Sequence, residues 1–181
     1  MKRERKIAIG WQDIGERLMP VLDGAWCKGF FIKDRSSERF EKELKHAQIP
    51  FVNISYRQKN ALCNDNLYRE ICTMLRGYDR VLLYGALCSR TFRIALPLLL
   101  KALSENGIEQ IDLFASLAFS FESKELREME QLNLETLQQS GLPIQIELYD
   151  NDKIFNKEGC ISKLFGDIIK EFQIYLKREE L

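Results

Sequence analysis

The sequence contains only one histidine, His46, and its cysteines are few and widely spaced. No two cysteines form a Cys-x-x-Cys pair, and their number is odd; they are Cys27, Cys63, Cys72, Cys88 and Cys160. Zinc sites and disulfide frameworks need regular, close pairs of such residues, so the sequence predicts neither a metal site nor a disulfide network. Cysteines of this kind are typical of a reducing compartment, and we therefore expect a cytoplasmic protein.

A net charge of one sign and a long apolar run are also missing. The 27 basic side chains balance the 27 acidic ones, which argues against a chain-wide attraction to nucleic acid or anionic lipid. The longest apolar-rich stretch, residues 94–100, lies between Arg93 and Lys101 and is too short to span a bilayer. We therefore expect no nucleic-acid partner and no membrane span, and the charged N-terminus is unlike a signal peptide.

Short apolar runs alternate with amphipathic segments along the 181 residues, a length typical of one domain. The apolar runs predict strands over residues 6–10, 29–33, 51–56, 80–84, 111–117 and 144–149. Helical spacing of apolar residues predicts helices over residues 11–22, 38–47, 64–75, 94–103, 124–140 and 160–181. The sequence Asp150-Asn151-Asp152 is typical of a turn.

Strands that alternate with helices of this length favour parallel pairing. The sequence therefore predicts an α/β fold of three layers, with a mostly parallel, doubly wound, Rossmann-like sheet and helices on both faces. Such sheets bind their ligands beyond the carboxyl ends of the strands. Functional residues are therefore expected in the segments 10–15, 34–37, 85–93, 118–122 and 150–153.

Two of these segments resemble stretches of FtsZ, the bacterial homologue of tubulin. Phe119-Ser120-Phe121-Glu122 looks like the Pro-Phe-x-Phe-Glu-Gly stretch of that family, and Asn151-Asp152-Lys153 follows the next strand, where FtsZ has Pro-Asn-Asp and a basic residue. Residues 80–97 keep the length of the FtsZ segment that holds the Gly-Gly-Gly-Thr-Gly-Thr-Gly signature, and Pro97 falls on the proline after it. The collinear order of these matches makes the chain similar to the N-terminal nucleotide-binding domain of the FtsZ/tubulin family.

The resemblance implies one FtsZ N-terminal-domain-like α/β domain over residues 1–181. Its last helix, residues 160–181, resembles the long central helix of that family. The resemblance does not extend to the second domain, so we expect no second domain here. The acidic loop residues that the family supplies to a neighbouring subunit's nucleotide are then also absent.

The glycine-rich phosphate loops of the family are altered in this sequence. In the signature window, residues 88–94, every glycine is replaced, and only Thr91 falls on a matching residue. The first loop keeps Gly10 and Gly15, each of which could form a turn, but Trp11 between them would crowd a phosphate. A tryptophan in such a loop could instead be an exposed stacking or partner-binding group.

Two interpretations stay open for the polar residues of these loops. Their side chains could bind a phosphate together with the N-terminus of the following helix, or they could cap and solvate that helix. Glu122 falls on the glutamate that contacts ribose in the family, or it is a favourable residue at a helix start. The candidate ligand-binding residues are therefore Gly10, Gly15, Ser89, Arg90, Thr91, Arg93 and Glu122. Arg90 could also lower the pKa of Cys88 and make this thiol reactive.

The altered signature favours a domain that has lost the GTPase residues and is not an enzyme. We expect a non-catalytic protein-interaction or regulatory module that binds a protein partner or a second copy of itself, with no resident cofactor, catalytic residue or metal. One alternative is a binder of GTP, another nucleotide or a phosphorylated small molecule through the segment 85–93. Another is an unrelated doubly wound enzyme whose catalytic groups lie far apart in the sequence.

Overall fold

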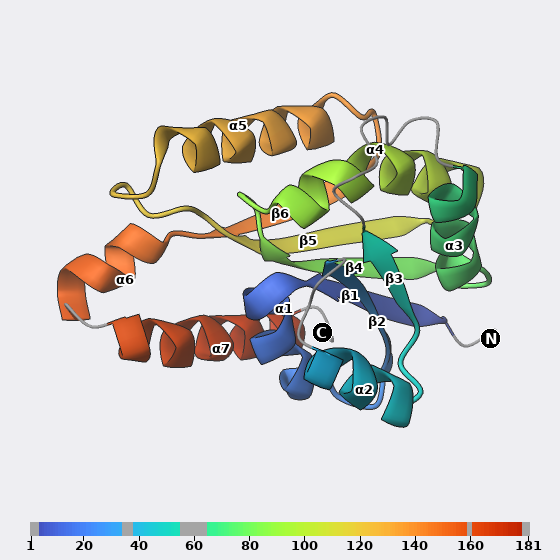
Figure 1. Ribbon diagram of the computed structural model, residues 1–181, viewed down its shortest axis with the longest axis horizontal. Coiled ribbons are helices and arrows are strands. Elements are labelled where there is room, and N and C mark those ends of the chain that lie inside the picture. Colours follow the sequence, from blue (N-terminus) through green and yellow to red (C-terminus); the bar gives the residue numbers. More distant parts are fainter. Residues whose placement is uncertain (1–3, 34–37, 55–64, 159–160, 179–181) are drawn as a thin grey trace.

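The computed structural model describes residues 4–33, 38–54, 65–158 and 161–178 (Figure 1). These residues form a six-stranded sheet with the order β3-β2-β1-β4-β5-β6, and all neighbouring strands run parallel. The strands are β1 Lys6–Trp11, β2 Trp26–Lys33, β3 Phe51–Ile54, β4 Arg80–Ala86, β5 Gln110–Ser116 and β6 Ile144–Tyr149. The predicted α/β fold with a parallel, doubly wound sheet is confirmed.

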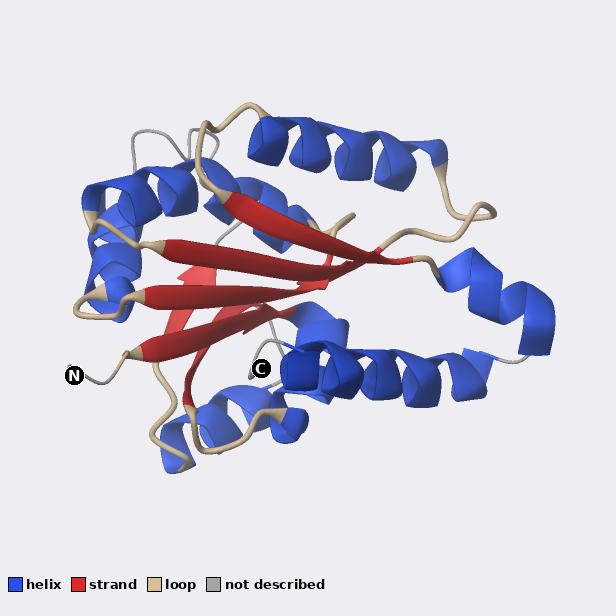
Figure 2. Cartoon of the chain, turned by 180° about the vertical axis from the view of Figure 1, so that it is seen from behind, coloured by secondary structure: helices blue, strands red, loops and turns tan. Residues whose placement is uncertain are grey.

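Helices cover both faces of the sheet, as Figures 1 and 2 show from opposite sides. One face carries α3 Asp65–Leu75, α4 Arg90–Glu105 and α5 Lys124–Gln138. The other face carries α1 Gln12–Leu18, which continues as the short 3-10 helix Met19–Val21, α2 Glu38–His46 and α7 Ile161–Arg178. Helix α6, Asn151–Glu158, lies beyond the carboxyl end of β6 and leads toward α7. The three layers of the prediction are therefore present.

The central strand β4 shows how the sequence builds two cores. Val81 and Leu83 join the apolar cluster beneath α3 and α4, whereas Leu82 and Tyr84 join the cluster beneath α7. All four side chains are fully buried. Because both faces of a parallel strand are covered, such a strand appears in the sequence as a continuous apolar run rather than as an alternating one.

A buried ion pair joins β4 to β5. The guanidinium Nε of Arg80 donates to Oδ2 of Asp112 at 2.8 Å, and Asp112 is completely buried. The Arg80 guanidinium also lies over the Trp26 ring, 5.5 Å from its centroid. A charge removed from water needs such a partner, so the two residues depend on each other.

Helix starts were predicted less well than strands. Trp11 is the last residue of β1 rather than the first of a helix, and α4 begins at Arg90, four residues before the predicted start. The predicted turn over residues 150–152 is wrong, because Asn151 begins α6. The Oδ1 atom of Asp150 accepts from the N–H of Asp152 at 3.0 Å, so its carboxylate caps this helix. The predicted loop 34–37, residues 55–56 and 64, and residues 160 and 179–181 lie outside the described residues.

Candidate functional site at the carboxyl end of the sheet

The strand order reverses between β1 and β4. The chain continues from β1 toward β2 on one side, and from β4 toward β5 on the other. In open α/β sheets this reversal creates the crevice in which ligands bind, next to the carboxyl ends of the two strands. Trp11 and Ala86 are the last residues of β1 and β4, and the N-terminus of α4 begins a few residues further on. A nucleotide site in this fold is therefore expected at the ends of these two strands.

Two stacked aromatic rings occupy this position. The rings of Trp11 and Phe92 are nearly parallel, with their centroids 4.2 Å apart, and neither residue is exposed. The indole N–H of Trp11 donates to the carbonyl of Ala86 at 2.9 Å, which ties the carboxyl ends of the two strands together. The expectation that Trp11 lies exposed in a loop is wrong, because the pleat of β1 directs its side chain into the core beneath α4.

The glycines near the ends of β1 and β4 leave space for aromatic rings. A Cβ atom added at Gly85 would lie 2.4 Å from the Trp11 ring, and one added at Gly10 would lie 2.6 Å from the Tyr84 ring. At Gly15 the added atom would come within 3.1 Å of the backbone of Gly10. Gly15 therefore lets α1 pack closely on the end of β1. Close packing accounts for each of these glycines, whether or not a ligand binds nearby.

The hydroxyl groups at the start of α4 are engaged within the chain. The Ser89 side chain accepts from the N–H of Phe92 at 3.1 Å and caps the helix, as one of the two sequence interpretations expects. The Thr91 hydroxyl accepts from the amide of Gln12 at 3.3 Å. Both residues are buried. The contact between Thr91 and Gln12 links the N-terminus of α4 to the start of α1.

Arg90 and Arg93 extend toward α5. A guanidinium N–H of Arg90 is paired with the carboxylate of Glu125, and a guanidinium N–H of Arg93 donates to the hydroxyl of Thr136 at 3.1 Å. The two contacts lie near opposite ends of α5. The arginines therefore join α4 to α5, and their proposed role as phosphate ligands stays a prediction.

Carboxylates of this chain bind three successive backbone N–H groups after β5. Ala118 N–H donates to Glu130 at 2.5 Å, Phe119 N–H to Glu122 at 2.7 Å, and Ser120 N–H to Asp152 at 3.0 Å. Converging N–H groups of this kind form an anion-binding concavity. Here the bound anions are side chains from α5, from the loop itself and from α6. Glu122 thus anchors its own loop, and its role toward a ribose stays a prediction.

The same carboxylates influence the thiol of Cys88. Burial raises the pKa of Cys88 to about 11, and the charges of Glu122 and Glu130 add to this effect. Arg90 pairs with Glu125 instead, so the expectation that it lowers this pKa is wrong. Burial also raises the pKa of Glu130 from its usual value, although the Ala118 N–H acts in the opposite direction. At neutral pH Cys88 is a thiol and a poor nucleophile.

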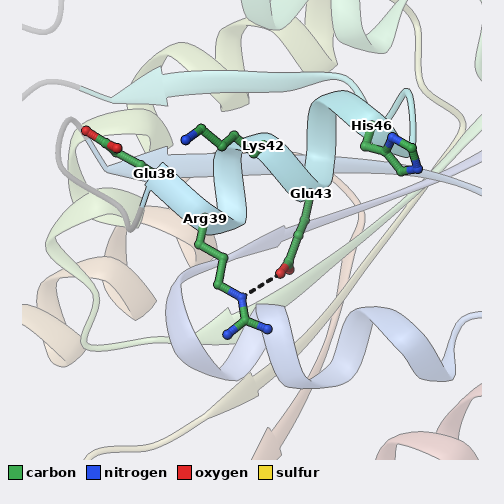
Figure 3. Close-up of a pocket in the computed structure, with 5 residues that line it drawn as sticks. All are labelled: Glu38, Arg39, Lys42, Glu43 and His46. Atoms are coloured by element: carbon green, nitrogen blue, oxygen red, sulfur yellow. Dashed lines mark hydrogen bonds and ion pairs between the residues drawn. The ribbon is translucent and has the colours of Figure 1, made fainter.

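Hollows lined by described residues lie away from the reversal of strand order. One of them, of about 800 Å³, runs along α2 and is lined by Glu38, Arg39, Lys42, Glu43 and His46. Figure 3 shows these side chains on one helix, with Arg39 paired to Glu43. A second hollow, of about 470 Å³, lies between β3 and α3, and a small one lies between β6 and α7. An open surface along one charged helix offers no converging groups for catalysis.

The part of the chain that the structure describes contains neither a metal-binding cluster nor a membrane-spanning helix. No group of three or more histidine, cysteine, aspartate or glutamate side chains is placed to hold a metal ion. No described helix combines the length and the apolar composition needed to cross a membrane.

Several residues of this site gave no signal in the sequence. Phe92 lies in the altered signature window, but nothing in the sequence indicates that it stacks on Trp11. The contacts of Glu130 and Asp152 with the segment 118–120 had no signal in the sequence either, because these residues come from separate elements. The one available signal was Trp11 directly after an apolar run, which fits a buried strand end as well as a loop.

No protein-family model matches the chain, and none of the curated proteins does. Among solved structures, the C-terminally truncated TubZ of Clostridium botulinum phage c-st superimposes with a TM-score of 0.71 and 19% identity over 96% of this chain. A second structure of this TubZ gives 0.70 and 21% over 98%. The chain has the fold of the tubulin/FtsZ family. The predicted resemblance is confirmed at the level of the fold.

The match spans only part of the longer protein. It covers 59% of each TubZ chain. A short-chain dehydrogenase/reductase of Veillonella parvula, solved in complex with NADP, is a more distant neighbour, with a TM-score of 0.55 and 16% identity over 78% of this chain and 67% of its own. Both similarities are to the α/β, Rossmann-like fold of this chain. At these identities they describe the fold and not an activity.

Proposed function

We propose that this chain is a tubulin/FtsZ-type domain that acts as a non-catalytic protein-interaction or regulatory module in the cytoplasm. The observation that carries the proposal is the buried stack of Trp11 on Phe92 at the strand-order reversal. A nucleotide bound at this position needs backbone N–H groups that are open to its phosphates. Two fully buried rings at the carboxyl ends of β1 and β4 leave a phosphate chain no direct approach to this backbone.

The electrostatics of the neighbouring loop support the same proposal. The N–H groups of residues 118–120 already bind the carboxylates of Glu130, Glu122 and Asp152. A phosphate brought to this loop would have to displace these carboxylates and would be repelled by them. Because Arg90 and Arg93 contact α5, they do not offset this repulsion at the loop.

A role in protein contacts is supported by the surface. Four large apolar side chains are exposed among the described residues: Phe121, Leu132, Leu148 and Ile174. They lie on the loop after β5, on α5, on β6 and on α7. Phe121 packs against the rings of Phe119 and Phe155, whereas the other three side chains lie on separate elements. Exposed apolar groups that gather in a patch, as these rings do, are typical of protein interfaces. The partner is therefore another protein or a second copy of the chain.

The test is a titration of the purified chain with GTP and GDP by calorimetry, together with an assay of phosphate release. We expect no heat of binding and no release above the background of the buffer. An active FtsZ protein, measured in parallel, shows that both assays respond. Binding of GTP in the micromolar range followed by its hydrolysis would disprove the proposal.

A matched pair of variants makes the test sharper. Phe92→Ala removes one ring of the stack, whereas Leu132→Ala removes an exposed side chain of α5 and leaves the stack intact. If the rings are what excludes the nucleotide, any gain of nucleotide affinity should occur in Phe92→Ala alone. Circular dichroism verifies that both variants are folded.

A further inference from the structure

The most exposed large apolar side chain belongs to a cluster of three phenylalanines. Phe121 is 61% exposed. Its ring stacks on Phe119, with centroids 4.7 Å apart, and both rings contact the ring of Phe155 at centroid distances of 5.6 and 5.8 Å. We call these three residues the aromatic patch. Phe119 and Phe121 belong to the loop after β5 and Phe155 belongs to α6. Both segments follow the carboxyl ends of strands, as Figure 1 shows.

The aromatic patch is held in place before any partner arrives. The N–H of Phe119 donates to Glu122, and the N–H and hydroxyl of Ser120 both donate to Asp152, at 3.0 and 3.3 Å. These bonds fix the backbone on the N-terminal side of Phe121, while stacking restricts its ring. Little conformational entropy is then lost when a partner binds, which is a property of energetically dominant interface residues.

Two carboxylates flank the patch without a cationic partner among the described ion pairs. Glu122 follows Phe121 directly, and Asp152 binds the residue that precedes it. The nearby cations are directed elsewhere, because Lys153 pairs with Asp150, Lys124 with Glu128 and Arg90 with Glu125. The patch therefore combines an exposed aromatic face with negative charge on both sides.

We propose that the aromatic patch binds an arginine side chain of a different protein. A guanidinium stacks on aromatic faces and at the same time donates hydrogen bonds to carboxylates, so one arginine satisfies both features. A purely apolar partner would cover Glu122 and Asp152 without replacing their water. Nucleic acid would be repelled by them. This proposal rests on the interaction role proposed above and names the surface and the chemistry of its partner.

The chain itself already makes the contact that we propose. The guanidinium of Arg17 on α1 lies over the ring of Phe165 on α7, 4.0 Å from its centroid. The aromatic patch offers the same kind of face toward solvent, with two carboxylates added. A partner arginine bound there would lose about tenfold in affinity when the exposed ring is removed.

The experiment is a selection of unbiased displayed peptides on the intact chain, with Phe121→Ala used for counter-selection. The peptides that survive are synthesised and their affinities measured on the wild type, Phe121→Ala and the control Leu132→Ala, which removes a comparably exposed side chain on α5. We expect peptides enriched in arginine that bind Phe121→Ala at least tenfold more weakly and Leu132→Ala unchanged. Replacing their arginine by citrulline, which is uncharged, should abolish binding.

Several results would overturn the proposal. One is a selection that yields no peptide able to distinguish the wild type from Phe121→Ala; another is a set of peptides without arginine. Self-association of the chain that Phe121→Ala abolishes would assign the patch to a second copy instead. A failed peptide selection would not change the result of the nucleotide titrations, which test the proposed function. Conversely, GTP hydrolysis would disprove the proposed function but would not change the measured peptide affinities. Asp152→Asn, whose remaining oxygen can still accept from the N–H of Ser120, separates the effect of charge from that of the ring.

Discussion

The substitution Gly85→Ala tests whether position 85 must be glycine because the ring of Trp11 occupies the space beside it. The added Cβ would lie 2.4 Å from the ring of Trp11. The ring would have to move by roughly 1 Å to restore van der Waals contact, although it is fully buried and stacked on Phe92. Overpacking of this kind costs about 1–3 kcal/mol, and loss of the hydrogen bond to Ala86 adds about 1 kcal/mol. We expect the free energy of unfolding to fall by about 2–4 kcal/mol.

The measurement is equilibrium unfolding in urea, followed by circular dichroism, in the wild-type and Trp11→Ala backgrounds. Trp11→Ala alone should cost about 3–5 kcal/mol, because a large buried side chain is lost. In that background Gly85→Ala should cost almost nothing, since the atom that it would strike is gone. Gly24→Ala is the control, because a Cβ added there has no atom within 4 Å.

Two results would refute this reasoning. The first is a loss in Gly85→Ala that does not exceed that in Gly24→Ala. The second is an equal loss of stability in both backgrounds, which would show that Gly85 is required for its backbone conformation rather than for the space that Trp11 takes. Double-mutant cycles isolate this coupling because the two residues are in contact and are expected to be non-additive.

Three further outcomes are expected. Alkylation of Cys88 in the folded chain, followed by mass spectrometry across a pH series, should be slow at pH 7 and accelerate only toward pH 11, because burial raises its pKa to about 11; fast reaction at pH 7 would contradict this. Asp112→Ala should destabilise the chain by about 3–5 kcal/mol in urea, because it removes the carboxylate that pairs with the buried guanidinium of Arg80; a loss under 1 kcal/mol would be inconsistent with the ion pair. Nucleotides and sugar phosphates should not raise the melting temperature; stabilisation that Arg90→Ala with Arg93→Ala abolishes would instead establish the phosphate-binding alternative.

The architecture was predictable because it depends on local patterns. The runs at residues 81–84 and 113–115 are apolar on successive positions, which is typical of strands covered on both faces, and the amphipathic segments between strands specify helices. Parallel order then follows from the alternation of strands and helices. Errors occurred at helix starts, where Asp150 and Ser89 could cap a helix or form a turn with the same side chain.

The sequence predicted where the candidate site lies, but not which contacts its side chains make. The segments 85–93 and 118–122 do lie at the carboxyl end of the sheet, as the strand pattern indicated. What each side chain does there follows from neighbours that are distant along the chain. The indole of Trp11 binds a carbonyl 75 positions away, and Asp152 binds an N–H 32 positions away.

The sequence by itself therefore determined the number of strands and their parallel order, since hydrophobic periodicity and element order are properties of neighbouring residues. The resemblance to the FtsZ/tubulin family came instead from short motifs in collinear order, at residues 119–122 and 151–153. Only the tertiary structure decided that Trp11 is buried against Phe92 and that carboxylates bind the loop after β5. The physical reason is that the register between strands brings side chains from separate elements together. The direction of a side chain at a strand end depends on the pleat, and a shift of one residue reverses it. The absence of a net charge and of long apolar runs could exclude classes of partner, but it could not reveal which loop N–H groups already bind the chain's own side chains.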